Sequence, residues 1–155
     1  MVRIPVFLLL IVIFQCSYAQ TFDKVKRIII HTAPFLVVEG EDTILVHPIY
    51  GIDKDEILKY PYVKSYKIER RKDISNILKL CNKIKESRRV DTRYRFVYKV
   101  LIEGFDKRNR IKFSLGIQRC GLCILDDKYK YEGCDKDFLD KLRIYVPNLR
   151  HVILW

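Results

Sequence analysis

The sequence predicts a single α+β domain in which an antiparallel β-sheet of hairpins and meander connections packs against about two helices. Short runs of alternating apolar and polar residues, separated by turn residues, recur along the chain. Two other segments carry apolar residues at helical spacing. The connections between these segments are short, which favours an antiparallel sheet covered by helices on one face.

Residues 1–19 are typical of a secretory signal peptide. Arg3 supplies a positive start, the eleven residues 4–14 are almost wholly apolar, and Ser17 and Ala19 place small residues before a cleavage site at Gln20. An apolar run of this length is shorter than the roughly 20 residues that span a bilayer, so a retained anchor is the less favoured alternative. We therefore expect an exported protein, periplasmic or extracellular, with one domain over residues 20–155.

The first part of this domain is expected to be mostly β-structure. Residues 25–31 are β-branched and apolar and predict a strand. Residues 35–38 and 43–46 flank a Glu-Gly-Glu-Asp segment, a composition typical of a hairpin turn. A loop with one helical turn at residues 55–59 should follow, and residues 63–69 predict another strand.

Residues 73–87 predict the first helix. Asp73 stands where an N-cap residue would, and the apolar residues that follow recur at helical spacing. This spacing turns Cys81 towards the core, while Lys79 and Lys83 face water.

Residues 94–102 and 111–117 alternate most clearly and predict a β-hairpin. A strand at 122–125, a turn at 126–128 and a strand at 129–132 should extend it into a meander. Asp135 or Asp137 is expected to cap a second helix, which carries Phe138, Leu139, Leu142 and Tyr145 on one face and ends before Pro147. The apolar tail, residues 149–155, should pack as a final strand or against the sheet.

Four cysteines remain beyond the leader, and an oxidising compartment predicts that they form two disulfides: Cys81, Cys120, Cys123 and Cys134. Three connectivities are open. We prefer Cys120 with Cys123, which flank an expected two-residue turn, and therefore Cys81 with Cys134. The C-x-x-C pair also suggests a thiol oxidoreductase or redox sensor, but that chemistry favours a cysteine at a helix start, and the residues after Cys123 predict a strand.

Positive charge is concentrated in the middle third of the chain. The formal net charge is +11 at pH 7, and residues 67–112 hold sixteen Lys and Arg against six Asp and Glu. Such a region attracts anions, although a charge run is also typical of an ordinary solvated face. If the helix and the hairpin tip lie side by side, they present one positive surface. The candidate partner-binding residues are Arg70, Arg71, Lys72, Lys79, Lys83, Arg88, Arg89, Lys107, Arg108 and Arg110.

The sequence contains no residue pattern from which we predict a catalytic, cofactor-binding or metal-binding site. His31, His47 and His151 are isolated in sequence, with no glutamate placed beside them for base or metal chemistry. No serine lies in a G-x-S-x-G turn.

The sequence therefore favours a non-enzymatic, exported interaction protein, of which an inhibitor or immunity-type protein is one concrete version. Its expected partner is an acidic protein, an anionic polysaccharide or a membrane surface. Lysines alternate with Tyr129 and Tyr131, as in some single-strand nucleic-acid binders, but strand alternation explains this more simply and an exported protein seldom meets nucleic acid. An envelope structural protein held by its leader is a further alternative.

Overall fold

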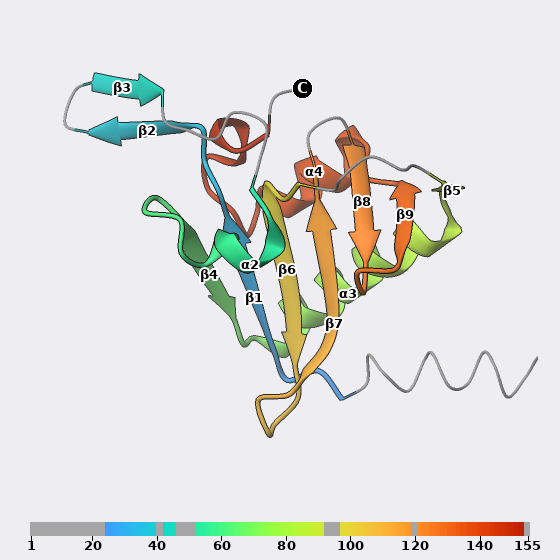
Figure 1. Ribbon diagram of the computed structural model, residues 1–155. Coiled ribbons are helices and arrows are strands. Elements are labelled where there is room, and N and C mark those ends of the chain that lie inside the picture. The colour runs from blue at the N-terminus through green and yellow to red at the C-terminus, as the bar shows by residue number, and fades with distance from the viewer. Residues whose placement is uncertain (1–23, 40–41, 46–51, 92–96, 119–120, 154–155) are drawn as a thin grey trace, which may run out of the picture.

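The computed structural model describes residues 24–39, 42–45, 52–91, 97–118 and 121–153 (Figure 1). The predicted leader and its cleavage site lie outside these ranges, as do His47, Cys120 and residues 94–96 of the predicted hairpin. The single α+β domain with an antiparallel sheet is confirmed over the described residues.

Seven strands form the main sheet, in the order β4-β1-β6-β7-β8-β9-β5, and each pairing is antiparallel. The predicted meander is its centre, because β6 to β9 pair in the order of the chain. The strands are β1 (Arg27–Thr32), β4 (Lys64–Ile68), β5 (Arg88–Val90), β6 (Val100–Phe105), β7 (Ile111–Ile117), β8 (Leu122–Leu125) and β9 (Tyr129–Glu132). The predicted N-terminal hairpin is also present, as a separate sheet of β2 (Leu36–Glu39) and β3 (Asp42–Leu45) that Figure 1 shows apart from the main one.

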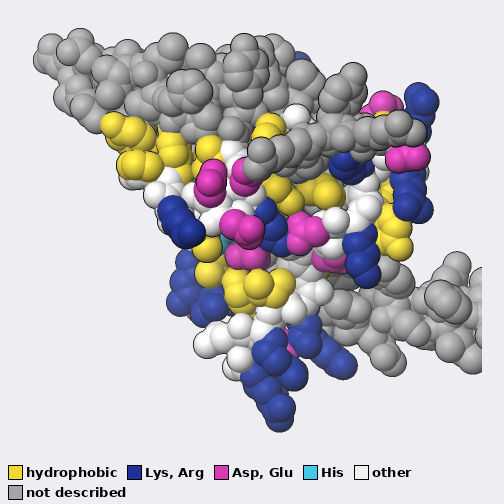
Figure 2. Space-filling view, in the orientation of Figure 1, with side chains coloured by type: hydrophobic (Ala, Val, Ile, Leu, Met, Phe, Trp, Pro, Cys, Tyr) yellow, Lys and Arg dark blue, Asp and Glu magenta, His cyan; other side chains and the backbone are white. Residues whose placement is uncertain are grey.

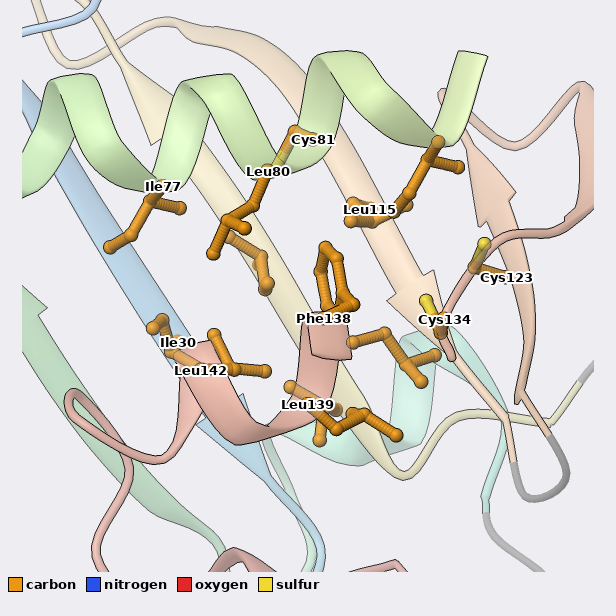
Figure 3. Close-up of a cluster of buried hydrophobic side chains, with 14 of the residues drawn as sticks. Ile30, Ile77, Leu80, Cys81, Leu115, Cys123, Cys134, Phe138, Leu139 and Leu142 are labelled. Atoms are coloured by element: carbon orange, nitrogen blue, oxygen red, sulfur yellow. The ribbon is translucent and has the colours of Figure 1, made fainter. Parts of the chain in front are cut away.

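Two helices cover one face of the main sheet, α3 (Arg71–Glu86) and α4 (Lys136–Leu142) (Figure 1). Alternate strand residues such as Ile30 and Leu115 meet Ile77 and Leu142 from these helices, and all four are fully buried (Figure 3). Burial of this apolar layer supplies the main driving force for folding.

The opposite face carries a smaller apolar cluster under a third, short helix, α2 (Lys54–Ile57), which the sequence predicts as a helical turn at 55–59. Ile57 packs there with Tyr98, Leu101 and Ile124. The sheet is therefore partly buried on both faces.

The helix ends differ in part from the prediction. Asp73 is not the N-cap of α3, because the cap position is Arg70. Asp73 lies in the first turn, where its negative charge interacts favourably with the positive end of the helix dipole. Asp135 does cap α4, because its carboxylate accepts a hydrogen bond of 2.8 Å from the N–H of Phe138. α4 ends at Leu142, before Tyr145.

The tail packs against the rest of the domain as a 3-10 helix, η2 (Leu149–His151), instead of as a strand. Leu149, Val152 and Ile153 are buried in the main core. The N–H of Phe35 donates a hydrogen bond of 2.9 Å to the carbonyl of His151, which ties the tail to the segment after β1.

Candidate functional site

The register of the sheet brings two separate basic segments to one end of the molecule. Ile68, at the end of β4, lies opposite Ile28 of β1, which in turn lies opposite Gly104 of β6. Two strand spacings, about 10 Å, separate β4 from β6 at this level. The chain leaves β4 for α3 here and leaves β6 for the β6–β7 turn. We call the exposed cations of these two segments the basic end: Arg70, Arg71, Lys72, Lys107, Arg108 and Arg110.

Figure 2 shows Lys and Arg side chains projecting below the sheet at this end. α3 also begins here, so the partial positive charge of its N-terminus adds to the same field. Asp73, in the first turn of α3, offsets part of it.

A buried carboxylate shapes the hairpin tip. Asp106 is 6% exposed, and its Oδ1 accepts hydrogen bonds from the N–H groups of Arg108 (2.8 Å) and Arg110 (3.0 Å). Its Oδ2 pairs with the side chains of Arg110 (2.8 Å) and Lys112 (3.4 Å). Burial alone would raise the pKa of Asp106, but the hydrogen bonds from Arg110, Arg108 and Lys112 hold the pKa well below its usual range. The tip is therefore an ordered turn in which the charge of Arg110 is compensated.

Arg88 and Arg89 do not join the basic end, whereas Lys79 and Lys83 follow Lys72 along α3 at about 1.5 Å per residue. Lys79 and Lys83 are exposed on α3, behind the sheet in Figure 1. Arg88 and Arg89 belong to β5, the edge strand opposite β4. Six strand spacings separate these edges, about 29 Å, so the ten residues do not form one surface. Their role in binding stays a prediction.

Arg89 belongs instead to a second group, which we call the basic edge: Arg89, Lys128 and Lys130. Together with Val90 and Asp91 they line a cavity of about 500 Å³. Pairing of β5 with β9 places Val90 opposite Lys130, and the Arg89 guanidinium lies 4.3 Å from the centre of the Tyr129 ring. Sequence reasoning missed the two lysines as partners of Arg89 because they lie outside the basic third of the chain. In the sequence, the alternation of these lysines with Tyr129 and Tyr131 was the feature that could have indicated the group.

Three buried cysteines gather under the sheet. Cys81 of α3, Cys123 of β8 and Cys134 are all free thiols, and Figure 3 shows Cys123 next to Cys134. The prediction of a two-residue turn between Cys120 and Cys123 is wrong, because Cys123 lies within β8 and is paired with Ile117 of β7. Cys120 lies outside the described residues, so its pairing stays a prediction.

The pKa values of these thiols differ with their surroundings. Burial raises the pKa of Cys81 to about 12, and the neighbouring Cys123 adds to this. The Cys134 thiol donates a hydrogen bond to Cys123, which lowers the pKa of Cys123. Burial, followed by that same hydrogen bond, raises the pKa of Cys134 well above its usual range.

On the other face of the sheet, His31 is not isolated, contrary to the expectation from sequence. Its Nδ1 lies 2.8 Å from Ser65 Oγ, and its Nε2 lies 3.5 Å from Glu103 Oε2. A serine, a histidine and a carboxylate in contact can support nucleophilic catalysis when a substrate cleft borders them. The cavity lined by residues 143–151 and the one lined by Arg89, Lys128 and Lys130 include none of these three side chains. We therefore interpret the contacts as partners for a buried histidine.

Two further observations concern only the described part of the chain. No group of three or more His, Cys, Asp or Glu residues there is arranged to hold a metal ion. No helix formed by those residues is both long and apolar enough to cross a bilayer.

Comparison of the chain with family models, with curated proteins and with solved structures gives no match.

Proposed function

We propose that the protein is an exported, non-enzymatic interaction protein that docks an acidic protein partner through the basic end. The observation that supports this proposal is the register of β4, β1 and β6, which assembles exposed cations from two separate segments at one end of the sheet. An inhibitor or immunity-type protein is one form that this function can take.

The structure of the hairpin tip favours a shaped partner, such as a folded acidic protein, over a diffuse anionic surface. Asp106 holds the turn by hydrogen bonds to two backbone N–H groups, so Lys107 and Arg108 extend from an ordered backbone. Neither of these two cations pairs with a carboxylate of another described residue. Each exposed ion pair contributes at most about 1 kcal/mol, so affinity must come from several cations acting together.

The observations on the thiols do not favour the oxidoreductase alternative. An attacking cysteine must be accessible, and Cys123 is fully buried on a strand instead of standing at a helix start.

A pull-down with a charge-reversal variant tests the proposal. We expect the immobilised wild-type chain to retain an acidic protein from an extract of its source at about 0.1 M salt. It should lose that protein at about 1 M salt, where the Debye length falls from about 10 Å to about 3 Å. The variant reverses four residues of the basic end to Glu, and retention at low salt should be lost: Arg70, Arg71, Lys107 and Arg108.

The matched control carries the same change in net charge on exposed residues away from the basic end, and it should bind like wild type: Lys59, Lys136, Lys141 and Arg150. Retention that salt does not weaken, or that the first variant keeps, would contradict the proposal. Equal loss in both variants would mean that net charge alone attracts the partner. Binding only of an anionic polysaccharide or of acidic lipid vesicles would refute the protein partner.

A further inference from the structure

Cys134 lies beside the start of β8 because the β8–β9 ladder continues past its last strand residue. Leu122 is paired with Glu132, and beyond this pair the N–H of Cys134 donates a hydrogen bond of 3.1 Å to the carbonyl of Gly121. Gly121 has a φ of +78°, and a Cβ at this position would lie 3.0 Å from the carbonyl oxygen of Cys134. The close approach of the two chain segments therefore depends on a glycine here.

This approach brings two sulfur atoms together. The Cys134 thiol donates a hydrogen bond to Cys123, and the Cys123 sulfur itself lies 3.5 Å from the carbonyl of Tyr131 on β9. Figure 3 shows the two side chains next to each other, Cys123 on β8 and Cys134 on the segment after β9. A disulfide spans Cα atoms about 4.4–6.8 Å apart, and adjoining chain segments whose cysteine side chains lie next to each other are where such a span can be met.

We propose that Cys123 and Cys134 form a disulfide, which would bind β8 to the segment between β9 and α4. This pairing replaces the one that the sequence alone favours. It goes beyond the docking function and does not depend on it.

Cys81 is a poorer partner for either sulfur. It comes from α3, and it influences Cys123 and Cys134 through electrostatics without a hydrogen bond to either.

The oxidant is a small-molecule or protein disulfide. The Cys123 thiolate attacks one sulfur of the oxidant, forms a mixed disulfide and releases one thiolate. Cys134 then loses its proton to solvent, attacks the Cys123 sulfur and releases the second thiolate. Two cysteine thiols are oxidised and one disulfide is reduced to two thiols. Because both cysteines are buried in the folded chain, the exchange belongs to folding or to local opening.

Peptide mapping tests this pairing. The chain is refolded in a mixture of reduced and oxidised glutathione, its remaining thiols are alkylated, and trypsin then separates the cysteines. Cys81 falls in peptide 80–83, Cys120 and Cys123 in peptide 120–128, and Cys134 in peptide 131–136. We expect mass spectrometry to find 120–128 linked to 131–136.

A Cys120→Ser variant makes the assignment unique, because Cys123 is then the one cysteine of its peptide. The link should persist in this variant and in the control Cys81→Ser, and it should be lost in Cys123→Ser. Fragment ions that break between Cys120 and Cys123 locate the link in the wild-type chain if the variant does not fold. A link from 80–83 to 131–136, a bond within 120–128, or alkylated Cys123 and Cys134 would each overturn the proposal. None of these results depends on whether an acidic partner binds.

Discussion

Alkaline pH should destabilise the reduced protein through the ionisation of Cys81. Burial raises the pKa of this thiol from 9.0 to about 12 in the folded chain. The folded state therefore holds the proton over a pH range in which the unfolded state releases it. The stabilising contribution of Cys81 is complete below pH 9 and is lost as the pH rises from 9 towards 12.

The size of the loss follows from the shift in pKa. Each pKa unit corresponds to about 1.36 kcal/mol, so the full rise in the pKa of Cys81 contributes about 4 kcal/mol to the free energy of unfolding. pH 11 lies most of the way from the unfolded pKa to the folded pKa. The expected loss of unfolding free energy from this one group is therefore about 3 kcal/mol at pH 11. That is a large share of the 5–15 kcal/mol that is typical of natural domains.

Urea unfolding of the reduced wild type and of Cys81→Ala, at pH 8 and at pH 11, measures this contribution. The variant should be the less stable protein at pH 8, because it leaves space in the core. Tyrosines and lysines titrate in both proteins, so their effects cancel in the comparison. The free-energy difference between the two proteins should shift by about 3 kcal/mol in favour of the variant at pH 11. If both proteins lose the same free energy of unfolding between pH 8 and pH 11, the pKa of Cys81 is not raised in the folded chain.

Two substitutions test the packing and capping described above. A Cβ in Gly116→Ala would overlap the ring of Tyr98, so we expect a loss of about 1–3 kcal/mol in urea unfolding. This loss should shrink when Tyr98→Ala is present, and equal losses in both backgrounds would count against the contact. Asp135→Ala should cost about 1 kcal/mol because α4 loses its cap, while Asp135→Asn keeps the acceptor and should cost less. Equal losses in the two Asp135 variants would argue against the cap.

Local sequence patterns predicted most of the helices and strands. They failed where pairing with a strand distant in sequence, or the position at which a helix begins, determines the structure. The alternation of residues 111–117 and the cap at Asp135 depend on nearby residues, and the structure confirms both. β5 was missed because Arg-Arg-Val shows no alternation, and it becomes a strand by pairing with β9. Asp73 has the chemistry of a cap, but the helix begins earlier, after Arg70.

The grouping of the candidate site residues could not be predicted, because it depends on the order of strands. The sequence identifies the cations of the basic third, but only the sheet order separates Arg89 from Arg70 and joins Arg89 to Lys130. In the same way, the contact between His31 and Glu103 requires β1 to lie beside β6.

The position of β1 between β4 and β6 has a consequence for how the chain folds. β6 to β9 are consecutive hairpins whose pairings close short loops, so they can form early. β1 is the first strand of the main sheet to be synthesised, yet one of its two partners, β6, follows about 70 residues later. Until β6 has been made, the backbone N–H and C=O groups on that edge of β1, which includes Ile28 and Ile30, remain unpaired and can pair with another chain. We therefore expect the main sheet to close only after nearly the whole chain has been made.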